Sequence, residues 1–436
     1  MIACLLKRIR TLVLIHLQPE VSYTALMLGV LRRYKHAPEY ILAVNAGSSS
    51  IKAVVYEIGA QLEVVCQCTI ENIGQSGVVL KTQSETIHDA VFLPVDVKTH
   101  PAAIVAIMGW INQQIKTDNL LAIGHRIVHG GPQYYQPQVI NDQLIADLQA
   151  FSSYDPDHLP NSIQLIKKLT SLFPNLPQVA CFDTAFSHNL PRVAQILPIP
   201  RKYEQEGLRR YGFHGLSYSY LLLRLRELDA AAANGRVIFA HLGSGASLAA
   251  IRGGQPLDVT MGLTPASGIL MSTRSGDLDP GIAWYLHHKA GISTIQFNSM
   301  VNHQSGLLGV SETSADMKTL LQNENTDERA AEAVNLFCYQ AKKAIGSMAA
   351  VLGGVETLVF SGGIGEKAPL IRARICEGLE FLGLELDEAG NNSNEPIISA
   401  QTSRVSVRVI HTDEESVIAQ QVVGVINNSS INKRGL

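Results

Sequence analysis

The sequence is poor in several features that mark large protein classes. Its 436 residues include only six cysteines and no Cys-x-x-Cys pair, which predicts a reduced, cytoplasmic protein without structural zinc. The formal net charge of −3 gives no reason to expect nucleic acid or an anionic membrane as a partner. No apolar run is long enough to span a bilayer. Any anion-binding site must therefore be a local cluster of arginine and histidine side chains.

Common motifs of nucleotide-binding and hydrolytic enzymes are also missing. There is no Gly-x-x-x-x-Gly-Lys-Ser/Thr phosphate loop and no Gly-x-Gly-x-x-Gly dinucleotide fingerprint. The Gly-x-Ser-x-Gly motif of serine hydrolases and the His-Glu-x-x-His motif of zinc proteases do not occur either. A nucleotide site in this chain would have to be built in another way.

Residues 41–56 combine a buried strand, a turn of small residues and a second strand. The turn, 47–50, is Gly-Ser-Ser-Ser, and Lys52 follows it. Such a turn can direct amide N–H groups and hydroxyls at one phosphate, and the lysine adds positive charge beside it. An ordinary polar hairpin is the alternative, and this stretch alone does not decide between the two.

The same pattern recurs at 239–251, where His241 stands in the place of Asn45. A third glycine-rich segment, 361–366, follows a predicted strand and precedes a predicted helix, an arrangement that brings a nucleotide close to the backbone. The chain is also longer than one hydrophobic core usually serves. Together these features predict a duplicated α/β domain, with the two turns facing each other across a cleft.

Basic side chains stand where they could hold an anion. Arg126 follows a short predicted strand, His214 lies beside two arginines between glycines, and Arg274 lies in a loop of small residues. A guanidinium in such a loop can hold a carboxylate or a phosphoryl group through two hydrogen bonds. The alternative for Arg274 is a surface ion pair with Asp277 or Asp279.

Acidic side chains end or begin two further elements. Asp183 follows a predicted buried strand, where a carboxylate can orient a metal or a nucleophile, although capping a helix is the alternative. The acids at 413–415 begin the last predicted helix, and they could satisfy its dipole or serve Mg²⁺. Cations outnumber candidate general bases in this inventory. That balance favours phosphoryl transfer, in which the protein mainly positions groups and neutralises charge.

Six segments of the chain resemble the acetate kinase family and occur in that family's order, over roughly residues 40–425. The resemblance implies an α/β fold of two ribonuclease H-like domains of the actin and sugar kinase type, with a nucleotide cleft between them, and a homodimer. The first domain would comprise 39–187 and a C-terminal helix at about 416–436, and the nucleotide-binding domain would comprise 188–415. Residues 1–38 look unlike the rest and are expected to be an extension of unknown role. The six segments are 45–52, 124–131, 182–186, 210–215, 273–280 and 363–366.

The resemblance also implies roles for residues at matching positions. Two residues, His214 and Arg274, would stabilise the transition state. The acceptor carboxylate would be bound by Arg126 and His158. The full catalytic set implied is Asn45, Arg126, Asp183, His214 and Arg274.

Metal and nucleotide sites follow from the same resemblance. Asn45 and Glu414 would hold the cofactor, Mg²⁺ or Mn²⁺, and ATP or ADP would be the nucleotide substrate. The implied nucleotide-binding residues are Lys52, His241, Leu242, Gly243, Ser244, Gly245, Asp316, Met317, Lys318, Gly363, Ile364, Gly365 and Glu366.

The implied reaction is the attack of a carboxylate oxygen on the γ-phosphorus of ATP, in line, to give an acyl phosphate and ADP. Acetate is the expected acceptor, and propionate or another short acid is the alternative, because one methylene in an apolar pocket is worth only ~1–3 kcal/mol. A nucleotide-gated binding module of the same superfamily is the alternative from another class. Arg126 and Arg274 argue against it, because such a module has no use for a carboxylate pocket.

The chain departs from the family pattern without losing a central catalytic group. Several departures fall on the nucleotide side, so the choice of nucleotide stays open. The positions that differ are Leu159, Ser187, Ser244, Lys318 and Lys367.

Overall fold

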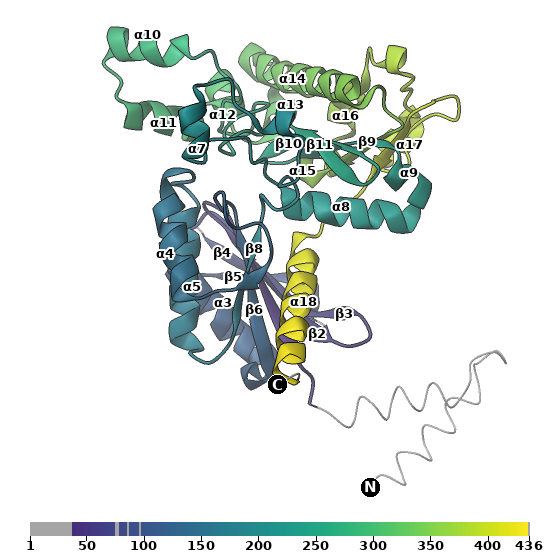
Figure 1. Ribbon diagram of the computed structural model, residues 1–436. Coiled ribbons are helices and arrows are strands. Elements are labelled where there is room, and N and C mark those ends of the chain that lie inside the picture. Colours follow the sequence, from purple (N-terminus) through teal and green to yellow (C-terminus); the bar gives the residue numbers. More distant parts are fainter. Residues whose placement is uncertain (1–36, 75–77, 85–86, 96, 435–436) are drawn as a thin grey trace, which may run out of the picture.

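The computed structural model describes residues 37–74, 78–84, 87–95 and 97–434, which form an α/β fold built on two mixed sheets (Figure 1). One sheet is formed by the first part of the chain and the other by the second part. The last helix leaves the second part and returns to pack beside the first sheet (Figure 1). The extension expected over 1–38 lies outside the described residues except for 37 and 38.

The first sheet has eight strands among the described residues, in the order β5-β4-β3-β2-β1-β6-β8-β7. Neighbouring strands from β5 to β1 are antiparallel, whereas β6 is parallel to β1 and β8 is parallel to β6. The strands are β1 (Tyr40–Ala46), β2 (Ile51–Ile58), β3 (Leu62–Ile70), β4 (Val79–Ser84), β5 (Ile87–Pro94), β6 (Leu120–Ile127), β7 (Gln138–Val139) and β8 (Gln178–Phe182).

The second sheet repeats the central part of the first. Its order over the described residues is β11-β10-β9-β12-β13, with an antiparallel hairpin on one side of β9 and two parallel strands on the other. The run β3-β2-β1-β6-β8 has this same order and direction, so the predicted duplication is confirmed at the level of topology. The strands are β9 (Arg236–Leu242), β10 (Ala246–Arg252), β11 (Gln255–Val259), β12 (Thr357–Ser361) and β13 (Ser406–Val409).

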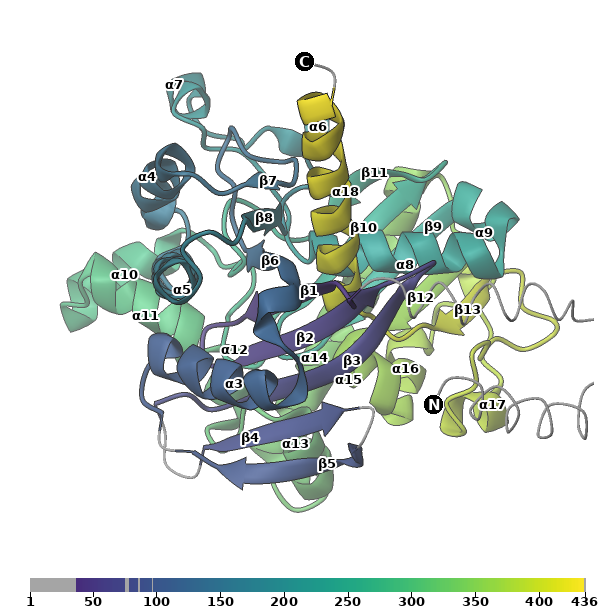
Figure 2. The same ribbon diagram turned by 90° about the horizontal axis from the view of Figure 1, so that it is seen from below.

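Alternate side chains of β1 cover both faces of the first sheet, as the period of a strand requires. Leu42 packs with helices α3 (His100–Gln114) and α5 (Leu159–Leu172), whereas Ile41 packs with α18 (Glu414–Arg434). Figure 2 shows α3 and α18 on opposite sides of these strands. A side chain at Gly124 of β6 would come within 2.4 Å of Ile418, so this glycine allows α18 to approach the sheet closely.

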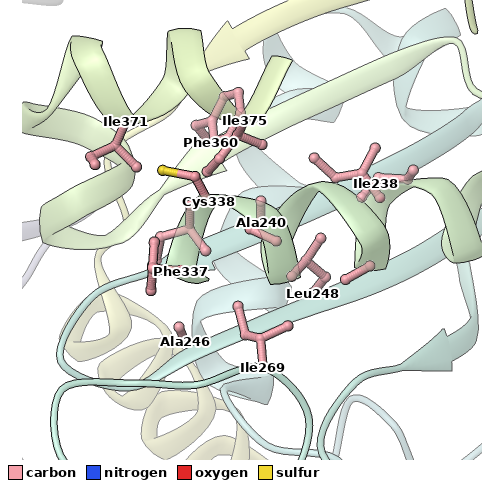
Figure 3. Close-up of a cluster of buried hydrophobic side chains, with 14 of the residues drawn as sticks. Ile238, Ala240, Ala246, Leu248, Ile269, Phe337, Cys338, Phe360, Ile371 and Ile375 are labelled. Atoms are coloured by element: carbon pink, nitrogen blue, oxygen red, sulfur yellow. The ribbon is translucent and has the colours of Figure 1, made fainter. Parts of the chain in front are cut away.

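The second sheet is covered in the same way by two helices. One face packs against α14 (Glu328–Leu352), whose residue Phe337 lies in the large cluster drawn in Figure 3 with Ile238, Leu248 and Phe360. The other face packs against α8 (Gly215–Leu228). Asp327 caps the N-terminus of α14.

Shorter helices connect these layers and surround the second sheet. They and the remaining short elements are α4 (Asp142–Ala150), α6 (Arg192–Gln195), α7 (Arg201–Gln205), α9 (Ala230–Asn234), α10 (Gly281–Ala290), α11 (Thr294–His303), α12 (Gly306–Ser311), α13 (Met317–Asn323), α15 (Gly362–Lys367), α16 (Pro369–Cys376), α17 (Glu388–Asn392), η1 (Thr117–Asn119), η2 (Phe151–Ser153) and η3 (Glu380–Leu382).

Two predicted boundaries were wrong. Strand β6 continues to Ile127, so Arg126 lies within the strand and not in a loop after it. The glycine-rich segment is the short helix α15, because the chain turns at Gly362 (φ 76°), where a side chain would meet the Leu242 carbonyl oxygen at 2.7 Å. Helix α18 begins at Glu414, close to its predicted start, and Glu414 and Glu415 lie in its first turn.

Candidate active site

The carboxyl ends of three neighbouring parallel strands bring together Asn45 of β1, Arg126 of β6 and Asp183 after β8. Arg126 donates to Asp183 Oδ2 from Nη2 at 2.6 Å and from Nε at 3.1 Å. It also donates to Asn45 Oδ1 at 3.3 Å. Because Asp183 is fully buried and both bonds are charge-assisted, they fix the plane of the guanidinium.

The start of α18 completes this cluster with two glutamates. The Asn45 amide donates to Glu414 Oε2 and to Glu415 Oε1, each at 2.8 Å, and Lys52 Nζ donates to Glu415 Oε2 at 2.5 Å. Burial raises the pKa of Glu414 to about 7, against the attraction of Arg126 and with help from the charge of Asp183. Glu415 was among the acids predicted to satisfy the helix dipole or serve Mg²⁺, but only Glu414 was assigned as a metal ligand; the hydrogen bonds of Glu415 to Asn45 and Lys52 place it in the same cluster.

Asp183 also meets the second domain. Its Oδ1 accepts from the Leu216 N–H at 3.4 Å, and its backbone oxygen accepts from Gly215 N at 2.9 Å. Both donors belong to the first turn of α8. One carboxylate thus binds Arg126 and also accepts from the first turn of a helix, whereas its role in orienting a metal or a nucleophile stays a prediction.

Two histidines of the second domain lie beside this cluster. His214 is the N-cap of α8 in the left-handed conformation (φ 58°), and its ring centroid is 4.3 Å from that of His241. Burial lowers the pKa of His214 well below its usual value, with further lowering by His241, Arg126 and Arg274. Burial lowers the pKa of His241 to about 4. Both rings are therefore neutral near pH 7 and can donate one hydrogen bond each without carrying charge.

Arg274 is a partly buried cation in the same place. Its Nη2 lies 3.5 Å from His158 Nε2, and its Nη1 donates to the Pro265 carbonyl oxygen at 3.3 Å. His158 in turn bonds through Nδ1 to Asp155 Oδ1 at 2.7 Å. Burial lowers the pKa of Arg274. Among the described residues no carboxylate lies within ion-pair distance of this guanidinium.

The proposed surface alternative for Arg274 was wrong. Asp277 Oδ1 accepts from the Gly268 N–H at 2.8 Å, and Asp279 Oδ1 accepts from the Gly281 N–H at 2.6 Å. Both aspartates thus shape the local backbone. Arg274 instead lies near His214 at the turn that contains Gly245. A Cβ atom built on Gly245 would lie 2.9 Å from His214 Nε2 and 3.7 Å from Arg274 Nη1.

The glycines of the second hairpin meet helix α15. A side chain at Gly243 would lie 3.7 Å from the Gly363 N–H group, and Gly363 itself has open space around it. Glu366 accepts from Gly362 N at 2.9 Å and bonds to His411 Nδ1 at 2.6 Å. Its carboxylate therefore holds the turn together, which leaves the backbone of α15 as the surface available to a ligand.

The remaining residues predicted for nucleotide binding have mixed environments. Asp316 caps α13 and accepts from the Thr319 N–H at 3.0 Å, and Met317 is buried in the large core cluster. Leu242 is fully buried, whereas Ser244 is exposed. The hairpin turn holds Gly243 and Gly245. Helix α15 holds Gly363, Ile364, Gly365 and Glu366, and Lys318 lies in the first turn of α13.

A family model described as the acetokinase family matches residues 40–420. The chain belongs to this family. It is 42% identical over 392 residues to the acetate kinase of Rhodopseudomonas palustris, a match that covers 88% of this chain and 98% of that protein. It is 39% identical over 391 residues to the propionate kinase of Citrobacter rodentium, covering 88% and 96%. The crystal structure of Porphyromonas gingivalis acetate kinase is 35% identical, with a TM-score of 0.79 and coverage of 89% and 100%.

Membership of the acetokinase family confirms the resemblance and the two-domain α/β fold. The chain is thus a phosphotransferase with a carboxyl group as acceptor, and its family uses ATP. The alternative of a nucleotide-gated binding module is not supported. Within 37–434, no described helix has the length and apolar character of a membrane span.

Proposed function

We propose that this enzyme transfers the γ-phosphoryl group of ATP to acetate, reversibly, with acetyl phosphate and ADP as products. The observation that carries the proposal is the environment of Arg274, a partly buried guanidinium whose hydrogen-bond partners among the described residues include no carboxylate. A cation held in this way is best stabilised by an anionic ligand. Arg126 and Arg274 both lie close enough to His214 for their charges to lower its pKa, so the ligand would meet several donors at once.

In the proposed mechanism, Arg126 and His158 hold the acceptor carboxylate. One carboxylate oxygen attacks the γ-phosphorus in line, the bond to the β–γ bridging oxygen breaks, and ADP leaves with that electron pair. No general base is required, because the carboxylate is already ionised. Arg274 and the neutral His214 donate to the transferring phosphoryl group, and such preorganised donors favour the charge distribution of the transition state. Asp183 keeps the Arg126 guanidinium in position.

The cofactor would be Mg²⁺ or Mn²⁺, held by Asn45 and Glu414. These side chains supply oxygen ligands, and Mg²⁺ in kinases commonly takes one or two carboxylates together with water and phosphate oxygens. Among the described residues no group of three or more His, Cys, Asp or Glu stands ready to hold an ion without such help. The donor set therefore fits an ion that arrives with the nucleotide, and when bound it would neutralise phosphate charge.

The nucleotide is assigned to the second hairpin and the adjacent helix starts. The amide groups of 243–245 would face the phosphates, α15 would lie against the nucleoside, and the start of α13 would contact the adenosine. Lys52 is included for its charge, although in the ligand-free protein it pairs with Glu415. The contact between Gly243 and α15 supports the assignment.

The test is to trap the product. Incubation with ATP, Mg²⁺ and hydroxylamine should yield acetyl hydroxamate only when acetate is present, and an Arg274→Ala variant should yield almost none. Hydroxamate formation that does not depend on acetate, or ATP hydrolysis without any hydroxamate, would rule out the proposed reaction.

Propionate is the second candidate acceptor, because a propionate kinase is among the similar proteins. A turnover series over formate, acetate, propionate and butyrate decides between them. A kcat/KM for propionate above that for acetate would reassign the substrate. The difference for one methylene is expected to be about 10–200-fold at most.

We further propose a homodimer formed through α10 and α11. Trp284, Tyr285 and Ile295 are 69%, 60% and 81% exposed, and α10 lies at the outer end of the second domain (Figure 1). Neither helix has a buried residue. An apolar face of this kind marks an interaction surface, and a second copy is the commonest partner. Light scattering should report a dimer that Trp284→Glu separates into monomers, whereas Val193→Glu, at an 84% exposed position on α6, should have no effect.

We also propose a cytoplasmic location and a division of the chain into two domains. The five described cysteines are all free and buried, which suits a reducing compartment. The two sheets and the packing of α18 on the first of them support a division into 39–187 with about 416–436, and 188–415.

A further inference from the structure

A short chain of hydrogen bonds ends on the ring of His214. His214 Nδ1 lies 2.8 Å from Ser247 Oγ, and Ser247 Oγ lies 2.5 Å from Tyr218 Oη. All three side chains are buried, with exposures of 8%, 1% and 0% in that order. None of them belongs to the arginine and carboxylate cluster of the first domain.

Local geometry explains why these side chains meet. His214 and Tyr218 are four residues apart at the start of α8, so they project from one face of the helix. Ser247 lies on β10, and its neighbours on the same face, Ala249 and Ile251, pack against α8. Ser247 is thus a single hydroxyl in an otherwise apolar row, and it stands opposite the two polar side chains of the helix.

The direction of the hydrogen bonds follows from the hydrogens available. Burial keeps the Tyr218 hydroxyl protonated by raising its pKa, and Ser247 is the partner of that hydroxyl among the described residues. If Tyr218 donates to Ser247 and Ser247 donates to His214 Nδ1, every hydrogen in the chain is used. In the opposite direction the Tyr218 hydrogen would be buried without an acceptor, which is the costlier arrangement.

We propose that Ser247 and Tyr218 are positioning residues that hold His214 in the neutral tautomer protonated at Nε2. Nδ1 is then the acceptor within the protein, and the Nε2–H group faces the turn at Gly245. Among the described residues no hydrogen bond to Nε2 is formed, so this donor is free for a ligand. The inference rests on the proposed function only in naming that ligand as the transferring phosphoryl group.

His158 provides an internal reference for the opposite tautomer. Its Nδ1 lies 2.7 Å from Asp155 Oδ1, a carboxylate oxygen that can only accept. The two histidines of the site should therefore differ in the nitrogen that carries hydrogen, with Nδ1 protonated in His158 and Nε2 protonated in His214.

Long-range ¹H–¹⁵N correlation spectra of the full chain, labelled at histidine and free of nucleotide, measure this directly. The resonances of His214 are identified by their loss in a His214→Gln variant. We expect Nε2 protonated and Nδ1 unprotonated in the wild type. A protonated Nδ1 in neutral His214 would overturn the proposal, and this measurement needs no activity.

Variants then test the two positioning residues. Ser247→Ala should mix the two tautomers and lower kcat by about tenfold, while both KM values change by less than about twofold. Tyr218→Phe should shift the same resonances less and lower kcat by about threefold. Ser219→Ala is the matched control, because Ser219 donates to the Gly215 carbonyl oxygen and not to a histidine; its spectrum and kcat should equal the wild type's.

The outcomes separate this inference from the proposed function. A loss of kcat in Ser247→Ala with unchanged His214 resonances would mean that Ser247 acts only through packing, and the proposal would fall. Wild-type protein that forms no acetyl hydroxamate but shows the expected tautomer would overturn the function and leave the tautomer standing.

Discussion

The two hairpins of this enzyme have the same strand pairing but different surroundings: the first lies among charged side chains and the second among neutral ones. In β1–β2 the residues opposite each other at the mouth of the turn are Asn45 and Lys52, and in β9–β10 they are His241 and Ser247. The first pair is bonded to two glutamates and an arginine. The second pair is bonded to the neutral partners His214, Ser217 and Tyr218.

In the proposed function, this difference would allow a duplicated domain to serve two tasks. The first hairpin collects full charges, which suit a metal ion and an acceptor carboxylate. The second presents neutral rings and small turn residues, which suit a phosphate chain that must be bound without being held too tightly. The two domains thus have the same strand arrangement, but the side chains at matching positions of the two hairpins differ.

The largest expected effect comes from cutting the charge network of the first hairpin. Arg126→Ala would leave Asp183 buried without its cation. We expect kcat to fall by about 10²–10³ or more, and the free energy of unfolding to fall by about 3–5 kcal/mol. Steady-state kinetics and urea unfolding measure the two. The double variant Arg126→Ala/Asp183→Asn should recover part of the stability but no activity, and near-normal turnover in either would refute the role of Arg126.

Arg274→Ala provides the contrasting case, because it removes a cation that has no carboxylate partner among the residues that the structure describes. We expect kcat to fall by about 10²–10³, with the free energy of unfolding within about 1 kcal/mol of the wild type. The same two assays apply. A loss of stability as large as that of Arg126→Ala would mean that Arg274 serves the fold.

The two hairpins should also differ in whether their side chains change charge near neutral pH, and the pH dependence of metal binding tests this difference. Burial raises the pKa of Glu414 to about 7, so this carboxyl gains a proton as the pH falls through that value. Because a metal ion needs the ionised form, the apparent affinity for Mg²⁺ should weaken by about tenfold between pH 8 and pH 6. The pKa of His241 is about 4 and that of His214 is also low, so neither ring changes charge over this range.

Mg²⁺ titrations of activity at several pH values provide the measurement. Glu414→Gln should bind Mg²⁺ more weakly and lose the pH dependence, because the amide does not titrate. An affinity that stays constant from pH 6 to pH 8 in the wild type would show that Glu414 is not a metal ligand.

The smallest effect is expected at the glycines of α15. A methyl group at Gly363 would meet no atom within 4 Å, so Gly363→Ala should change the free energy of unfolding by less than about 0.5 kcal/mol. It should still raise the KM for ATP, because it would project where the nucleotide is proposed to lie. For Gly362→Ala, the positive φ and the nearby Leu242 oxygen predict that the free energy of unfolding falls by about 1 kcal/mol or more. A normal KM in Gly363→Ala would argue against α15 as a nucleotide contact.

Much of the architecture could be predicted because it depends on neighbours along the chain. The strand periods, the small-residue turns and the capped helix α14 are local features, and they also revealed the duplication through Asn45 and His241. Where prediction failed, as at β6 and α15, the deciding contact was distant. The turn at Gly362 is required by the Leu242 carbonyl oxygen, which belongs to another strand.

The sequence by itself determined the class of fold and the family, since these are carried by short patterns, and it predicted which residue types are catalytic. Only the tertiary structure decided which groups are paired. Asn45 contacts Glu414 and Glu415 because α18 packs on the first sheet. Ser247 contacts His214 because α8 packs against one face of the sheet that contains β10. Hydrogen bonds and charge pairing act over a few ångströms in space, so residues hundreds of positions apart become partners only when packing brings them together.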